Sequence, residues 1–144
     1  MTVFKTKKCI IDCKDVKKKM RCAMYHDEKT DRRRKLGTYR AQKCQFIMKK
    51  KPCVAGDRCT FAHNTVEEFY HPEKYKAKFC SKKPEDCDYG AYCSFAHSEA
   101  EISVDLIHKY EKDADFYMFH FKTAWCPYNE EDHQRDTCVY AHNW

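Results

Sequence analysis

The eleven cysteines of this 144-residue chain fall into four sets, and each set closes with a histidine in the spacing C-x3-H. The four sets are Cys9, Cys13, Cys22 and His26; Cys44, Cys53, Cys59 and His63; Cys80, Cys87, Cys93 and His97; and Cys126, His133, Cys138 and His142. Structural Zn²⁺ takes four thiolate or imidazole ligands in a tetrahedron. The sets therefore predict four zinc sites, named fingers 1 to 4 in chain order.

The ligand spacing differs from finger to finger. Fingers 2 and 3 read C-x8-C-x5-C-x3-H and C-x6-C-x5-C-x3-H, whereas finger 1 reads C-x3-C-x8-C-x3-H. Finger 4 has only two cysteines and reads C-x6-H-x4-C-x3-H, so that Asp132 competes with His133 for one ligand position. We favour His133 because imidazole is the better zinc ligand.

Composition limits how such a chain can fold. Charged residues make up 35% of the sequence and the mean hydropathy is -0.91, which is too polar for one large apolar core. We therefore expect a small, zinc-stapled fold with little regular secondary structure, short helices in the linkers, and an unfolded metal-free form. The expected segments are finger 1 at 1–30, finger 2 at 37–66, finger 3 at 73–98, a helical linker at 99–115 and finger 4 at 119–144.

Local signals predict a few turns and one short helix. Gly56 and Gly90 each follow the second cysteine of their finger by three residues, where a turn with positive φ suits glycine. Asn64 followed by Glu67 resembles a capping box, which predicts a short helix that Pro72 would stop.

A second capping signal, Ser98 with Glu101, predicts a longer helix in the linker before finger 4. We expect this helix to run from about Glu99 to Lys112. Its apolar stripe, which we expect to pack on a finger or on the next lead-in, is Ile102, Leu106 and Tyr110.

An aromatic residue followed by a basic one stands before every finger, and three residues separate this pair from the first cysteine. The four pairs are Phe4-Lys5, Tyr39-Arg40, Tyr75-Lys76 and Phe121-Lys122. Repetition of this lead-in in register with the ligands indicates a repeat protein and supports finger 4 as a member of the series.

Positive charge is concentrated in the N-terminal part. Residues 1–63 contain 19 Lys and Arg against 6 Asp and Glu, whereas residues 98–144 contain 4 against 10. The first segment suits a polyanion; in finger 4, Glu130, Glu131 and Asp132 would repel phosphate. The candidate phosphate contacts are Arg32, Arg33, Arg34, Lys35, Lys49, Lys50, Lys51 and Arg58.

Aromatic residues recur in the closing turn of fingers 2 to 4, two positions before the histidine: Phe61, Phe95 and Tyr140. An exposed ring beside a metal-fixed turn can stack on an unpaired base; alternatively, the rings cover the zinc sites as miniature cores. Finger 3 adds Tyr89 where finger 2 has Ala55, so we expect finger 3 to hold a base best.

Beyond the ligands, the linkers at 31–34 (DRRR) and 71–76 (HPEKYK) make residues 1–97 resemble the tandem CCCH clusters of Unkempt-type RNA-binding proteins and of plant tandem CCCH proteins. Finger 4, preceded by Phe121-Lys122, resembles the leading finger of the plant type. The resemblance implies binding of short single-stranded RNA elements that contain uridine and adenine, in a protein that regulates mRNA.

Other functions fit the sequence less well. The chain has neither the C-x2-C pairs of RING or ribbon sites nor the H-x-E with P-C-x-x-C of zinc deaminases, so we expect no enzyme. The main alternative is a zinc-stapled protein-interaction scaffold that uses the acidic C-terminal unit as its binding surface. Double-stranded DNA is a weaker candidate, because no recognition helix follows the ligands.

Location and assembly are also expectations. No apolar run approaches the ~20 residues of a membrane span, and residues 1–9 have no signal-peptide core. An odd number of cysteines in metal-type spacings fits a reducing compartment better than a disulfide framework. We expect a monomer in the cytoplasm, with the nucleus as an alternative, and no membrane contact.

Overall fold

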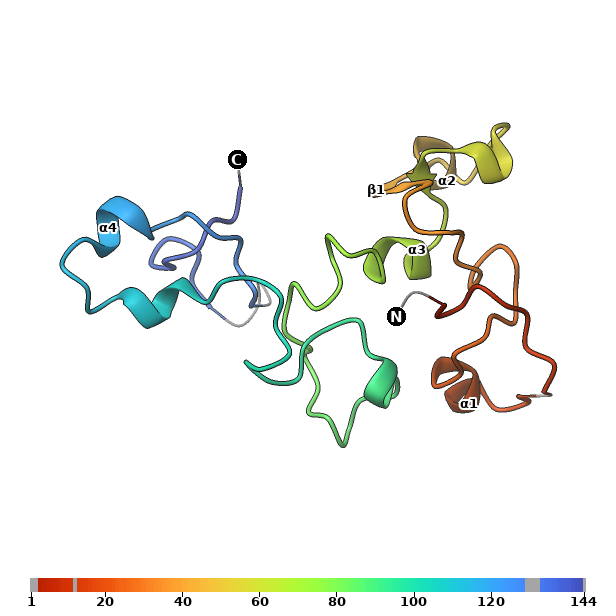
Figure 1. The fold of residues 1–144 in the computed structure, drawn as a ribbon, viewed down its shortest axis with the longest axis horizontal. Helices are drawn as coiled ribbons and strands as arrows, with labels where there is room; N and C mark the ends of the chain where they lie inside the picture. The colour runs from red at the N-terminus through yellow and green to blue at the C-terminus, as the bar shows by residue number, and fades with distance from the viewer. Residues whose placement is uncertain (1–2, 12, 129–132, 144) are drawn as a thin grey trace. The chain divides into compact units, whose positions relative to one another are not determined.

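The computed structural model describes residues 3–11, 13–128 and 133–143 (Figure 1). Its helices and strands are all short, and most of the described chain is turn or loop. The helices are α1 (Val16–Met20), α2 (Gln45–Met48), η1 (Gly56–Arg58), α3 (Thr65–Phe69), η2 (Gly90–Tyr92), η3 (Ile107–Tyr110) and α4 (Phe116–Phe119). The expectation of little regular secondary structure is confirmed. No described helix has the length and apolar character needed to cross a membrane.

The chain forms two compact units. One contains residues 1–75 and 85–94, and the other contains residues 76–84 and 95–144. The loop at 85–94, which carries two cysteines of finger 3, therefore belongs to the first unit.

A short parallel pairing between the start and the end of each finger is the common element of the fold. In finger 2 it is a two-stranded sheet of β1 (Arg40–Lys43) and β2 (Phe61–Ala62), and in the other fingers a single bridge. The first cysteine donates its backbone N–H to the carbonyl of the residue before the closing histidine: Cys9 to Tyr25 (2.8 Å), Cys44 to Ala62 (2.9 Å), Cys80 to Ala96 (2.8 Å) and Cys126 to Ala141 (3.0 Å). This bond brings the first and last ligands of a finger together.

The basic residue of the lead-in adopts a left-handed backbone in three fingers. Lys5, Lys76 and Lys122 have φ of 58°, 57° and 57°, a conformation that is uncommon outside glycine. Arg40 does not share it and lies in β1 instead. The repeated conformation shows that the lead-in is part of the finger.

Two local predictions from the sequence are confirmed. Gly56 and Gly90 have φ of 52° and 53°, and each begins a 3₁₀ helix. Asn64 caps α3, with its side chain accepting from the backbone N–H of Glu67 at 2.9 Å, and α3 ends before Pro72.

The prediction of a long helix in the linker is wrong. Within the expected range of 99–112 the structure has only η3, because Leu106 has a non-helical backbone (φ -85°, ψ 79°) that lets Leu106 and Ile107 both be buried. Glu101, the expected capping residue, instead directs its carboxylate to the side chain of Lys76 and the backbone of His97. Tertiary contacts have overridden the local helix signal.

Each unit has a small apolar core of its own. In the first unit the Phe4 ring lies 4.5 Å from that of Tyr70 and 5.3 Å from that of Tyr92. In the second unit Ile107 packs with Cys126 and Tyr140. Cores of this size cannot order the loops alone, which is why the metal sites matter.

Candidate zinc centres and nucleic-acid interface

The structure brings four Cys/His groups together, and in each group the candidate ligand atoms lie within 4.8 Å of one another. The groups are Cys9, Cys13, Cys22 and His26; Cys44, Cys53, Cys59 and His63; Cys80, Cys87, Cys93 and His97; and Cys126, His133, Cys138 and His142. His133 thus occupies the contested position of finger 4; Asp132 lies outside the described residues.

Distances within the groups match a zinc tetrahedron. In a tetrahedral site, two sulfur atoms that each lie 2.3 Å from the zinc are about 3.8 Å from each other. Two imidazole nitrogens that each lie 2.0–2.1 Å from the zinc are about 3.3 Å from each other. The Sγ atoms of Cys9 and Cys22 are 3.8 Å apart, and those of Cys126 and Cys138 are 3.9 Å apart. The Nε2 atoms of His133 and His142 are 3.3 Å apart. The donor sets therefore fit zinc in number, type and spacing.

The closing histidines of fingers 1 to 3 give a second sign of metal binding. Among the described residues, Nε2 of His26, His63 and His97 is buried without a hydrogen-bond partner. A buried polar nitrogen without a partner is costly, and coordination would satisfy it. The pKa of His63 is also lowered, mainly by burial and to a smaller extent by the charge of Arg34. A lowered pKa favours the neutral imidazole that zinc requires.

A carboxylate four or five residues after the closing histidine supports it in three fingers. Backbone N–H groups of the histidines donate to these carboxylates, from His26 to Asp31 at 2.9 Å, from His63 to Glu67 at 2.8 Å and from His97 to Glu101 at 3.1 Å. Sequence reasoning missed this role, although an acidic residue four or five positions after the closing histidine of fingers 1 to 3 was a usable signal. Such outer contacts orient metal ligands.

Each of these carboxylates also holds a cation. Lys5 donates to Asp31 at 3.0 Å, and Lys76 donates to Glu101 at 2.8 Å. In finger 2 the cation is Arg34, from the preceding linker, which donates to Glu67 at 2.7 Å. Lys5 and Lys76 therefore connect the lead-in of their finger to the carboxylate that supports its closing histidine.

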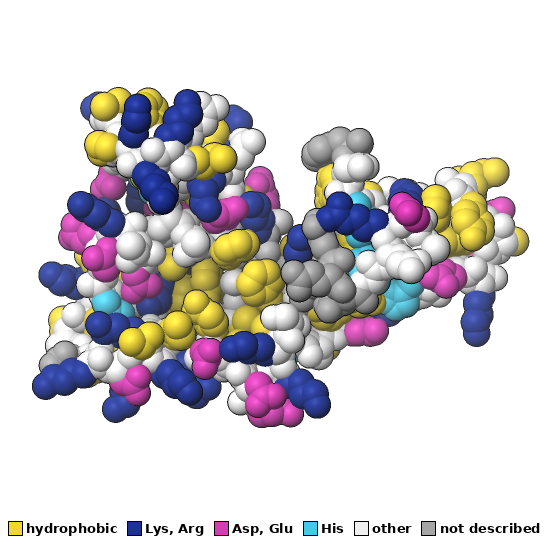
Figure 2. Space-filling model, turned by 180° about the vertical axis from the view of Figure 1, so that it is seen from behind, with side chains coloured by type: hydrophobic (Ala, Val, Ile, Leu, Met, Phe, Trp, Pro, Cys, Tyr) yellow, Lys and Arg dark blue, Asp and Glu magenta, His cyan; other side chains and the backbone are white. Residues whose placement is uncertain are grey.

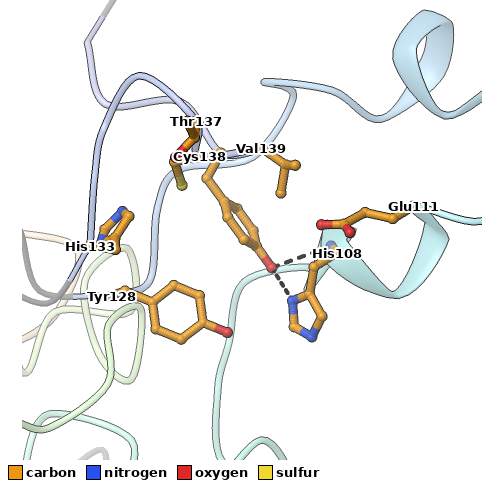
Figure 3. A pocket seen from close by; sticks show the side chains of 8 residues that line it. His108, Glu111, Tyr128, His133, Thr137, Cys138 and Val139 are labelled. Carbon is orange, nitrogen blue, oxygen red and sulfur yellow. Dashed lines mark hydrogen bonds between the residues drawn. The ribbon is translucent and has the colours of Figure 1, made fainter.

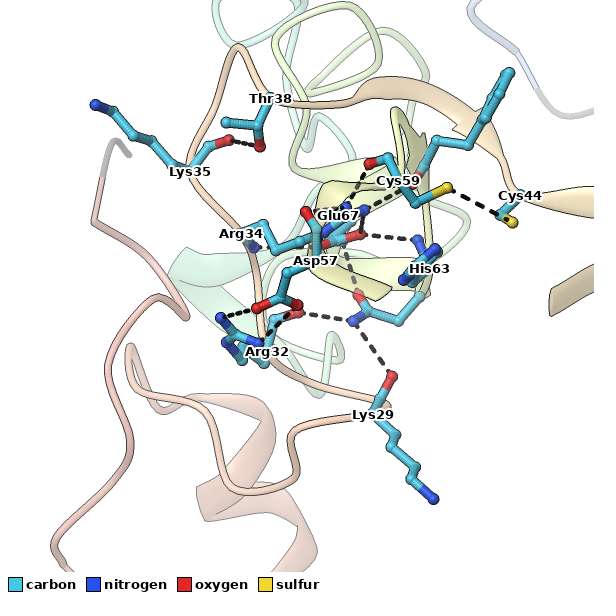
Figure 4. A network of polar contacts seen from close by, with 12 residues as sticks. Lys29, Arg32, Arg34, Lys35, Thr38, Cys44, Asp57, Cys59, His63 and Glu67 are labelled. Atoms are coloured by element: carbon cyan, nitrogen blue, oxygen red, sulfur yellow. Dashed lines mark hydrogen bonds and ion pairs between the residues drawn. The ribbon is translucent and has the colours of Figure 1, made fainter. Parts of the chain in front are cut away.

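Arg34 is the centre of a buried network in finger 2 (Figure 4). Its guanidinium reaches Glu67 with two nitrogens and donates to the carbonyls of Cys59 at 2.5 Å and Phe61 at 2.6 Å. Burial raises the pKa of Glu67, but the hydrogen bonds from Arg34 and from the backbone of His63, together with the charge of Arg34, outweigh burial and leave that pKa below its usual value. The network fixes the turn that carries the closing ligands.

This arrangement corrects the RNA-contact assignment of the arginine run. Arg33 is 1% exposed and Arg34 is 7% exposed, so neither can meet a phosphate. Arg33 donates to the carbonyl of Tyr70, and Arg32 pairs with Asp57 through both terminal nitrogens. Both buried arginines belong to the protein interior.

The remaining predicted cations lie on the surface. They are Lys35, Lys49, Lys50, Lys51 and Arg58, all of which are exposed. Figure 2 shows Lys and Arg side chains spread over one face of the N-terminal fingers. These residues remain available for phosphate contacts.

The predicted stacking rings differ in exposure. Tyr89 is 43% exposed, and Phe61 and Phe95 are half-buried. Tyr140 is 1% exposed, with its hydroxyl 2.6 Å from Nδ1 of His108, and burial raises its pKa to about 12. Its assignment as a stacking platform is wrong, because the ring is part of the core of its unit.

Comparison with known proteins agrees with this architecture. A family model described as "AtC3H23-like, CCCH zinc finger" matches residues 115–144. The chain is 32% identical over 72% of its length to the human RING finger protein unkempt homolog, and 34% identical over 56% to zinc finger CCCH domain-containing protein 47 of Arabidopsis thaliana. It is 29% identical over 70% to mouse UNKL, which is named provisionally as an E3 ubiquitin-protein ligase.

The ligand groups, the fold and these similarities identify the chain as a tandem CCCH zinc-finger protein with four sites suited to Zn²⁺. Among proteins of this class it is similar to the Unkempt type and to plant CCCH proteins. The chain spans only 14 or 15% of the length of these three relatives.

Proposed function

We propose that this chain binds single-stranded RNA, with zinc-fixed loops presenting aromatic faces to unpaired bases. The observation that carries the proposal is the exposed ring of Tyr89, directly before η2 in the loop between Cys87 and Cys93. Arg21 holds this loop by donating to the carbonyls of Cys87 and Asp88 at 3.2 and 3.0 Å. A ring on a rigid loop loses little entropy when a base stacks on it.

Surface charge supports the same function. The exposed lysines at 49–51 follow α2 directly, and Lys50 has a positive φ of 55° in a turn after that helix. These lysines belong to finger 2, the finger that also contains the half-buried Phe61. Their ammonium groups can contact phosphates, which the buried arginines cannot reach. We infer from the Unkempt-type similarity that the RNA elements contain uridine and adenine.

Replacing Tyr89 tests the stacking assignment. Tyr89→Ala should weaken RNA binding by about 1 to 3 kcal/mol, which is ~5- to ~150-fold. Affinity is measured by fluorescence anisotropy on an RNA obtained by selection from a random pool, and zinc content by elemental analysis. Tyr117→Ala is the control, because Tyr117 is 77% exposed in α4. Equal affinities of the two variants and the wild type would reject the assignment.

Salt dependence tests the phosphate contacts. If Lys49, Lys50 and Lys51 each meet a phosphate, replacing all three with alanine should lower the slope of log affinity against log salt by about 2, at ~0.7 per contact on a single strand. Replacing Lys109 and Lys112, in the acidic segment, serves as the control and should leave the slope nearly unchanged. An equal loss of slope in both variants would contradict the role of residues 49–51.

The wider role follows from this activity. We infer a non-enzymatic RNA-binding part of an mRNA-regulating protein, monomeric and located in the cytoplasm or nucleus. The ligase name of mouse UNKL applies to that protein; this chain's cysteines include no C-x2-C pair of the RING type. Each proposed zinc has four protein ligands, which leaves no open position for hydrolytic chemistry.

A protein-interaction scaffold is the second candidate function. One observation favours it: Tyr117, Met118 and Phe119 on α4 are 77%, 76% and 62% exposed. Adjacent exposed apolar side chains often mark contact sites for other proteins. If this function is the main one, Tyr89→Ala should not change partner capture, whereas Met118→Asp should abolish it.

A further inference from the structure

The second unit contains a pocket of about 400 Å³ that reaches the ligand group of finger 4, because His133 and Cys138 are among its lining residues (Figure 3). Its walls come from the finger, through Tyr128 and Tyr140, and from the linker before it, through His108 and Glu111. We propose that this pocket binds one RNA base that carries an exocyclic amino group: adenine, cytosine or guanine. The inference rests on the proposed RNA-binding function and adds a base-reading site to it.

The aromatic walls are fixed before any ligand arrives. Tyr128 stacks on Phe79, with ring centroids 5.3 Å apart and planes at 28°, and meets Tyr140 edge-on at 6.0 Å. The Tyr140 hydroxyl is held at 2.6 Å by His108 (Figure 3). Tyr128 keeps 36% of its surface exposed, so it offers contact area at the mouth of a rigid site. Rigid aromatic walls are what recognition of a splayed base requires.

Size restricts the occupant to something small. Pockets for small ligands range from ~300 to ~1,000 Å³, and this one lies near the lower limit. One base with part of its ribose is of this size, whereas a helix or a duplex is not. A single-stranded chain can turn one base into such a pocket while its backbone stays outside.

Charge determines which part of the nucleotide enters. The described residues that line the pocket include no Lys or Arg but do include Glu111. Residues 98–144 hold 10 Asp and Glu against 4 Lys and Arg, so a phosphate is repelled. A neutral base edge is not repelled.

Glu111 supplies the selectivity. An ionised carboxylate only accepts hydrogen bonds, and an exocyclic amino group only donates them. Glu111 lines the pocket, and among the described residues its carboxylate has no ion-pair partner, because the carboxylate that pairs with His108 and Lys109 is that of Glu99. Uracil carries no exocyclic amino group, and its one donor on the Watson–Crick edge, N3–H, lies between two carbonyl oxygens that repel a carboxylate. The pocket should therefore discriminate against uracil.

The test measures base preference at one position. Fluorescent 12-nucleotide oligouridine is compared with three versions that carry a central adenine, cytosine or guanine, using the full chain loaded with zinc. The wild type should bind at least one amino-bearing RNA about tenfold more tightly than oligouridine, the scale of one hydrogen bond to a charged group. Glu111→Ala should remove most of that preference.

Asp113→Ala is the matched control, because it removes one negative charge from the same segment but does not line the pocket. It should keep the preference. If Glu111→Ala keeps it equally, the pocket assignment is overturned although RNA binding stands. If the wild type binds none of these RNAs, nor any RNA selected from a random pool, the proposed function itself fails.

The location is checked separately by NMR titration with adenosine. Ring signals of Tyr128 and His108 should shift on addition of adenosine, and those of Tyr117 on α4 should not. Zinc content and the dispersion of the spectrum show that each variant is folded. Shifts that are absent from Tyr128 and His108 would overturn the assignment, whatever the affinities.

Discussion

Removal of zinc with excess chelator should unfold the whole chain, with loss of NMR dispersion and of near-ultraviolet circular dichroism. The physical reason is that the described helices have five residues or fewer and the apolar cores contain a few side chains each. Each structural zinc contributes on the order of 10 kcal/mol or more to folding, which exceeds what such cores can supply.

Two controls accompany this experiment. After the chelator has been removed, return of four equivalents of Zn²⁺ per chain should restore the spectrum, and Mg²⁺ should not, because thiolate and imidazole ligands select the softer ion. A chain that keeps dispersed resonances after its zinc has been removed and measured as absent would contradict the account.

The second large effect is expected at the buried ion pair of finger 2. Glu67→Ala should lower the free energy of unfolding of the zinc-loaded protein by about 3 to 5 kcal/mol, because it leaves the Arg34 charge buried without its partner. Urea denaturation followed by circular dichroism measures the loss. Glu67 is 1% exposed and also accepts from the backbone of His63, so zinc affinity of finger 2 should fall as well.

The exposed pair of Arg32 and Asp57 provides the control. The Asp57 side chain is 66% exposed, and Asp57→Ala should cost no more than about 1 kcal/mol. The double variant Arg34→Met with Glu67→Leu should recover part of the loss, because it removes the unpaired buried charge but leaves the backbone groups of Cys59, Phe61 and His63 without these partners. If Glu67→Ala costs no more than Asp57→Ala, the network does not have the role assigned to it.

The sequence was sufficient where a local pattern sets the structure. Ligand spacing located all four metal groups, including His133 in the irregular finger 4. The turn glycines and α3 followed from backbone preferences that act within a few residues. These features depend on near neighbours, which a single sequence displays.

The features that could not be predicted from the sequence depend on contacts between residues far apart in the chain. Arg34 lies 33 residues from Glu67, and a run of arginines has the same pattern whether it faces solvent or the interior. Tyr140 repeats the position of Phe61 and Phe95, but the linker residue His108 lies close enough to bond its hydroxyl and Ile107 packs against it. The non-helical linker has the same origin, because its residues are held by Lys76 and by the core.

Native mass spectrometry of the purified chain tests the central claim, that each of the four Cys/His groups holds one zinc, most directly. The wild-type chain should show a mass increase of four zinc ions, and each single replacement of Cys9, Cys44, Cys80 or Cys126 by serine should reduce this to three. A folded wild-type chain with fewer than four zinc ions would contradict this claim.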